Sequence, residues 1–143
     1  MSFCNQRWLP VFVLTLISQP SLAPAQSPDV IPTALYQAAQ AKRGKALYAA
    51  KCAVCHGKEL TGGGAPALAG TQFFTRDMNN KLGDVFRYMA HEMPAGQPGS
   101  LTHDQYADLM AFILQTNGFP TGDSPLSYDA ALQSSEIIYF ARR

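Results

Sequence analysis

Cys52-Ala53-Val54-Cys55-His56 is the stretch of this 143-residue chain from which the fold and the chemistry follow most directly. Two cysteines three residues apart, followed at once by a histidine, form the pattern that attaches a c-type haem. The two thiols can add to the two vinyl groups of the haem, and the histidine then offers an imidazole nitrogen to the iron. The motif predicts one haem c, bound covalently through Cys52 and Cys55, with His56 as an iron ligand.

Two other uses of the cysteine pair are open at this point. A redox disulfide of this spacing normally sits in a βαβ pattern, which the chain does not show. A zinc site usually needs a second pair of ligands at tight spacing, whereas the remaining histidines, His91 and His103, are twelve residues apart. Both alternatives are weaker than covalent haem attachment.

Length and composition favour one globular domain with a modest core. Apolar residues make up 47% and charged residues 15% of the chain, which is unlike a disordered segment. The formal net charge is +1, and all ten acidic and ten of the eleven basic residues follow Ala25. A chain so close to neutral lacks the basic surface that binds nucleic acid, so we expect no nucleic-acid partner.

The first 25 residues predict a targeting segment. Arg7 precedes an apolar run over residues 8–17, and Ala23-Pro24-Ala25 offers a cleavage site with small residues. Cleavage there would remove Cys4 and leave only the cysteines of the motif. A retained membrane anchor is the alternative, although the run is short for a spanning helix. We expect residues 1–25 to be a cleaved signal peptide, the mature chain to have no membrane span, and the protein to lie in the periplasm.

Helices are expected on both sides of the motif. Ala, Gln and Lys favour a helix over residues 34–55, with Thr33 as its N-cap and with Gly44 marking either a break or the close approach of another helix. Apolar residues at i, i+3, i+4 and i+7 predict an amphipathic helix over residues 80–91. A further helix starts after Thr102, because Gln105 completes a capping box.

The segments between and after these helices are expected to be less regular. Residues 58–70 and 93–99 contain clusters of glycine and proline and predict loops. Gly118 is the expected stop of the last long helix. Beyond it we expect a short helix around residues 129–133 and an extended stretch at 137–140.

A second iron ligand has to come from elsewhere in the chain, unless that position is open. The thioether of methionine suits haem iron and raises its reduction potential relative to two imidazoles. Met93 is favoured because it starts a stiff loop of prolines and glycines between two expected helices. His91 is the rival ligand. The other methionines in reach are Met78 in a polar stretch and Met89 and Met110 on apolar helix faces.

The chain resembles the class I c-type cytochromes. The matching features are Gly44 with Tyr48, the motif at 52–56, the run Gly64-Ala65-Pro66-Ala67-Leu68-Ala69-Gly70, Met93-Pro94, and Leu109 with Phe112. The resemblance implies a small all-α, cytochrome c-like fold of about three to five helices around one covalently bound haem. It also implies that the first and last helices cross near right angles, with Gly44 and Tyr48 against Leu109 and Phe112, and that the Pro66 carbonyl holds His56.

A finer resemblance concerns the function. The run Met93-Pro94-Ala95-Gly96-Gln97-Pro98-Gly99-Ser100-Leu101-Thr102, with Tyr106-Ala107-Asp108 and Asn117-Gly118-Phe119-Pro120 after it, is similar to small cytochromes, or cytochrome domains, that serve periplasmic quinoprotein dehydrogenases. It implies a single-haem electron carrier, not itself an enzyme, between such a dehydrogenase and a terminal oxidase or another cytochrome. The alternatives are a sensor or peroxidase with an open distal site, or a permanent cytochrome subunit of the dehydrogenase. Residues 26–118 would form the cytochrome c domain and residues 119–143 a C-terminal extension.

Overall fold

The computed structural model describes residues 34–74, 81–136 and 138 of the chain. The expected signal peptide, Thr33, Met78 and all of the expected extended stretch except Ile138 lie outside these residues. Statements about the fold below concern the described residues.

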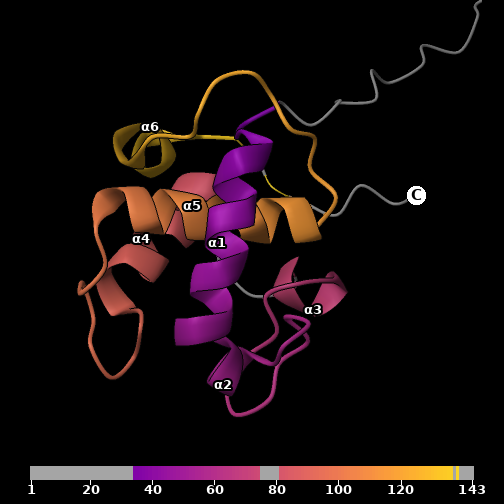
Figure 1. Cartoon of the computed structure of the whole chain (residues 1–143), viewed down its shortest axis with the longest axis vertical. Coiled ribbons are helices and arrows are strands. Elements are labelled where there is room, and N and C mark those ends of the chain that lie inside the picture. Colours follow the sequence, from indigo (N-terminus) through magenta and orange to yellow (C-terminus); the bar gives the residue numbers. More distant parts are fainter. Residues whose placement is uncertain (1–33, 75–80, 137, 139–143) are drawn as a thin grey trace, which may run out of the picture.

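The described residues are helical and contain no strand. The elements are α1 (Ala38–Lys51), α2 (Ala53–His56), α3 (Thr71–Phe74), α4 (Leu82–Glu92), α5 (His103–Thr116) and α6 (Tyr128–Gln133), arranged as Figure 1 shows. Two of them, α2 and α3, are single turns of four residues. The predicted all-α class is confirmed. None of the helices in the described ranges has the length and apolar character needed to cross a membrane.

Helix α1 differs at both ends from the helix expected over residues 34–55. It begins at Ala38, and Gln37 is its N-cap, so the prediction of Thr33 as the cap is wrong. Gln40 Oε1 accepts the backbone N–H of Gln37 at 3.2 Å and so satisfies a donor at the helix start. The helix passes through Gly44 without a break and ends at Lys51. Because Cys52 separates α1 from α2, the motif lies on a turn of its own.

The later helices follow the sequence more closely. The predicted amphipathic helix is α4, which ends at Glu92. Thr102 is the N-cap of α5: its Oγ1 accepts from Gln105 N at 3.2 Å, and Gln105 Oε1 accepts from Thr102 N at 2.9 Å. Gly118, with φ +83°, lies in the left-handed region after α5, where glycine is favoured.

Helix α1 crosses α5 (Figure 1). Gly44 of α1 lies where the two helices make their close contact. A Cβ at Gly44 would overlap the backbone carbonyl of Asp108 and would lie 3.0 Å from the Phe112 Cβ. One turn further on, Tyr48 packs on Phe112 with ring centroids 5.4 Å apart. Arg43 adds two charge-assisted hydrogen bonds to the Asp108 carboxylate, at 2.7 and 2.6 Å. The packing of Gly44 and Tyr48 on α5 is confirmed, and Asp108 is a partner that the sequence did not suggest.

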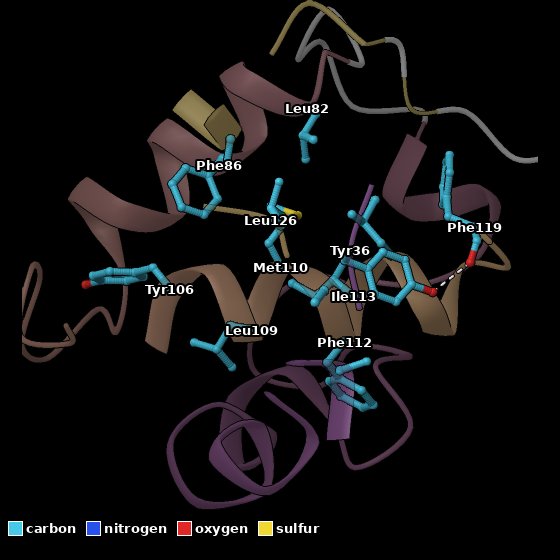
Figure 2. Close-up of a cluster of buried hydrophobic side chains, with 14 of the residues drawn as sticks. Tyr36, Leu82, Phe86, Tyr106, Leu109, Met110, Phe112, Ile113, Phe119 and Leu126 are labelled. Carbon is cyan, nitrogen blue, oxygen red and sulfur yellow. Dashed lines mark hydrogen bonds between the residues drawn. The ribbon is translucent and has the colours of Figure 1, made fainter. Parts of the chain in front are cut away.

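The core forms where α4, α5 and the ends of the described chain meet, and Figure 2 shows its side chains gathered along α5. Tyr36, just before α1, is fully buried, and its hydroxyl donates to the Phe119 carbonyl at 2.6 Å. Gln40 holds the same region from α1, because its side chain both donates to and accepts from the backbone of Leu126, at 2.9 and 2.8 Å. Phe119, Leu126, Ala131 and Ile138, from the part of the chain that was expected to form an extension, therefore share the core of the helical domain.

Replacing Gly44 with valine is predicted to destabilise the protein strongly. The new side chain cannot coexist with the Asp108 carbonyl, so α1 and α5 must separate, and we expect the free energy of unfolding to fall by about 3 kcal/mol. The matched control is Ala46→Val at an exposed position of the same helix, which should cost only about 0.5 kcal/mol through helix propensity. Chemical denaturation of the two variants gives the comparison, and equal losses would contradict the close crossing.

Candidate functional site

The cysteine–histidine motif forms a single helical turn at the end of α1. Backbone N–H groups of Cys55 and His56 donate to the Cys52 carbonyl at 3.1 and 3.0 Å and close the turn. Both cysteines are free, with Cys52 half-buried and Cys55 exposed, whereas His56 is buried. In the part of the chain that the structure describes, no group of three or more His, Cys, Asp or Glu side chains could hold a metal ion. Both thiols of the motif are therefore available for covalent attachment.

The imidazole of His56 is held by the loop that follows it. Its Nδ1 lies 2.7 Å from the Pro66 carbonyl oxygen. Because a carbonyl can only accept a hydrogen bond, Nδ1 must carry the proton, and Nε2 keeps the lone pair that binds a metal. Such a bond fixes both the tautomer and the orientation of the ring.

The loop over residues 57–70 folds back on the motif through its own backbone. Gly62 N donates to the His56 carbonyl and Ala65 N to the Cys55 carbonyl, each at 2.9 Å. From α1, the Tyr48 hydroxyl donates to the Gly57 carbonyl at 2.6 Å. Gly57 itself has φ +80°, and a Cβ there would collide with the Gly62 carbonyl. The glycines thus let the loop close around the motif and bring Pro66 to His56.

One large, mainly apolar cavity lies beside the motif. Its volume is about 460 Å³, within the range of pockets that hold cofactors. Cys52, Cys55 and His56 line it, and so does Met93 at the C-terminal end of α4. The other lining side chains include Leu68, Phe73, Val85, Tyr88, Met89, Leu101, Tyr106, Leu109, Ile113 and Ile138. The structure therefore brings all five residues singled out in the sequence (Cys52, Cys55, His56, Pro66 and Met93) to one cavity.

The other candidate iron ligands differ in whether they line the cavity. His91 is exposed, and neither it nor His103 lines the cavity. His103 instead stacks on Tyr128 with ring centroids 3.8 Å apart. Met89 does line the cavity, although the sequence suggested a core position for it. Two methionines, Met89 and Met93, thus reach the cavity from α4 and its end.

Tyr106 and Asn117 hold the walls of the cavity through hydrogen bonds that the sequence did not suggest. The buried Tyr106 donates from its hydroxyl to the Met93 carbonyl at 2.7 Å. The buried Asn117 accepts from Gly70 N at 3.0 Å and donates to the Leu68 carbonyl at 3.0 Å, which ties the end of the loop to α5. Both belong to the stretches that carry the finer resemblance, but no local pattern signals partners 13 and 47 to 49 residues away.

Burial changes the acid–base behaviour of two groups near the motif. It raises the pKa of Tyr48 to about 12, and the negative charges of the Cys52 thiolate, before haem is attached, and of Glu59 add to the effect. Burial, and then repulsion from Cys55, also raises the pKa of the Cys52 thiol. Tyr48 therefore stays a neutral hydrogen-bond donor to Gly57 throughout the neutral range.

These residues fit a haem attached through two thioethers. Two free thiols and an imidazole of fixed tautomer line the same apolar cavity, and no competing metal cluster occurs in the described residues. The family model described as "Cytochrome C oxidase, cbb3-type, subunit III" matches residues 39–113, more than half of the chain. The chain belongs to this family. It is a class I c-type cytochrome domain that binds haem c covalently and transfers electrons.

Similar proteins include two dehydrogenases. A thiosulfate dehydrogenase from Psychrobacter arcticus is 32% identical over 105 residues, which cover 57% of this cytochrome and 30% of the relative. This chain thus spans less than a third of that protein. The crystal structure of the sulfane dehydrogenase SoxCD from Paracoccus pantotrophus matches with a TM-score of 0.53 and 25% identity, over 80% of this chain and 67% of that chain. Neither name refers to a quinoprotein dehydrogenase, the class that the sequence had suggested.

Stability is predicted to fall between pH 10 and pH 12 as Tyr48 ionises. Its folded-state pKa of about 12 lies above the ordinary value of 10.0, so its contribution is complete below pH 10 and is lost as the pH rises towards 12. Urea unfolding of the wild type and of Tyr48→Phe over this range gives the test. The variant should start less stable by about 1 kcal/mol, since the bond to Gly57 is lost, and should fall less steeply. Parallel curves for the two proteins would contradict the prediction.

Proposed function

We propose that this cytochrome is a single-haem electron carrier of the periplasm, with His56 and Met93 as the two iron ligands. The chain contains one Cys-x-x-Cys-His motif, which supports one haem per chain. The sequence of residues 1–25 supports export, with cleavage after Ala25. The chain breaks no substrate bond itself.

The surroundings of His56 and Met93 support this ligand pair. When bound, the haem iron takes up and releases one electron. His56 is buried and held by Pro66, and Met93 is held through its backbone by Tyr106. Apolar walls from α4 and α5 exclude water, and two fixed ligands with little water nearby favour a high potential and a small rearrangement between redox states.

The mouth of the cavity supports transient docking of a redox partner. Val54 and Tyr88 are large apolar side chains that are 89% and 51% exposed, and both line the cavity. Apolar side chains at a small exposed patch are typical of weak electron-transfer interfaces, which bury less than about 1,200 Å². We infer that partners dock over the turn between Cys52 and Cys55.

The comparisons support a dehydrogenase as the electron donor. Since the similar proteins are named thiosulfate dehydrogenase and sulfane dehydrogenase, we propose a donor that oxidises reduced sulfur compounds, in place of a quinoprotein dehydrogenase. The acceptor would be a terminal oxidase or another cytochrome.

A second candidate is a permanent cytochrome subunit of such a dehydrogenase. The match to less than a third of the thiosulfate dehydrogenase favours it, because there a domain of this kind is part of a longer protein. Purification from the native cells in high salt distinguishes the two candidates. A transient carrier should purify as a single chain, and a permanent subunit should purify together with the dehydrogenase.

Absorption spectra of the periplasmically expressed protein test the proposed carrier. We expect one haem c per chain by pyridine haemochrome, a methionine–iron band in the oxidised protein, and no carbon monoxide binding by the reduced protein. His56→Ala should yield no stable holoprotein. Rapid carbon monoxide binding by the wild type would instead indicate an open distal site, as in a sensor or peroxidase.

Met93→Leu and Met89→Leu separate the two methionines that line the cavity. Both replacements keep an apolar side chain of similar volume, so packing should change by less than about 1.5 kcal/mol in each. Met93→Leu should lose the methionine–iron band and bind carbon monoxide, whereas Met89→Leu should keep the wild-type spectrum. The opposite pattern would make Met89 the ligand.

A further inference from the structure

Residues that follow α6 cap the N-terminal end of α4. The first N–H groups of a helix have no partner within it, and Lys81, the N-cap of α4, supplies no side-chain acceptor. Backbone carbonyls take this role: Glu136 accepts from Leu82 N at 2.8 Å, and Ser134 accepts from Gly83 N at 3.1 Å. The N-terminus of α4 is therefore capped by a segment about 50 residues later in the chain.

Gly83 allows this segment to approach the helix closely. A Cβ at Gly83 would lie 2.7 Å from the Ser134 carbonyl oxygen and 2.8 Å from that of Leu132. Both distances are well inside the contact distance of carbon and oxygen, so a side chain there would push the segment away from α4.

Tyr128 of α6 fixes the same segment to two helices at once. Its ring stacks on His103 at the start of α5, with centroids 3.8 Å apart and planes at 7°. It also meets Phe86 of α4 edge to face, at 5.2 Å and 73°. Arg87 Nη2 donates to the Leu132 carbonyl at 3.3 Å and adds a contact from α4.

Ile138 lies close after this segment in the sequence and lines the cavity. It is 1% exposed and lines the cavity that also contains Met89 and Met93. Met93 follows directly on α4, and its N–H donates to the Met89 carbonyl at 3.1 Å. A displacement of α4 would therefore move Met93 as well.

We propose that the C-terminal strap, residues 127–136 and Ile138, positions Met93 as an iron ligand by fixing α4, and that Ile138 seals this part of the cavity against water. The inference rests on the proposed ligation by His56 and Met93. The strap residues act through α4 and do not bind the iron, so they are positioning residues. A sealed, dry cavity with a firmly held thioether favours the reduced, less charged state of the site.

Ile138→Ala and Gly83→Ala test the strap in the full-length holoprotein. The first opens the wall of the cavity, and the second displaces the cap from α4. Both should lower the reduction potential, weaken the methionine–iron band on warming, and speed carbon monoxide binding by on the order of tenfold, because local opening becomes easier. The matched control is Leu114→Ala, which removes a side chain that is also 1% exposed but does not line the cavity.

The control separates positioning from general stability. Leu114→Ala should lower the melting temperature about as much as Ile138→Ala and leave the potential and the carbon monoxide rate unchanged. If all three variants change these two readouts equally, the strap is only part of the core and the inference is wrong. If Ile138→Ala yields no holoprotein, Ile138→Val takes its place with a smaller change in the same direction, and unchanged readouts in it overturn the inference. A wild type without the methionine–iron band would refute the ligation itself.

Discussion

The close crossing of α1 over α5 at Gly44 is the constraint on which the rest of the site depends. Helix α1 ends at the motif, and α5 supplies Tyr106, Leu109 and Ile113 to the cavity wall. Contact of the Gly44 backbone with the Asp108 carbonyl sets the distance between the two helices. With that distance set, the turn that contains Cys52, Cys55 and His56 faces the apolar side of α5.

Two further attachments turn this crossing into an enclosed site. On one side, Asn117 ties the loop over residues 57–70 to the end of α5, and the loop holds His56 through Pro66. On the other side, Tyr106 holds the backbone of Met93, and the C-terminal strap holds the start of α4. Asn117 directly follows α5, Tyr106 lies in it, and α1 and α4 pack on it. The positions of both proposed ligands therefore depend on α5.

The residues around the proposed iron ligands are buried, whereas residues at the mouth of the cavity are exposed, and this contrast suits the proposed electron transfer. His56, Tyr106 and Asn117 are buried and hydrogen-bonded, and in the described part of the chain no buried side-chain polar atom lacks a partner. At the mouth, Val54 and Tyr88 remain exposed and Cys55 reaches solvent. Such a structure can meet partners at the surface while the surroundings of the iron ligands change little.

Much of the fold and of the site could be predicted from local sequence patterns. The spacing of Cys52, Cys55 and His56, the capping box of Thr102 and Gln105, and the apolar periodicity of α4 each involve residues that are close in the chain, so the sequence determined them. The tertiary structure alone decided that Asp108 faces Gly44, that Asn117 holds the loop, that Met89 joins Met93 at the cavity, and that Ser134 and Glu136 cap α4. These contacts join residues that are far apart in the chain. They are made by common side chains and by backbone carbonyls, and which partner each of these groups finds depends on how the helices pack.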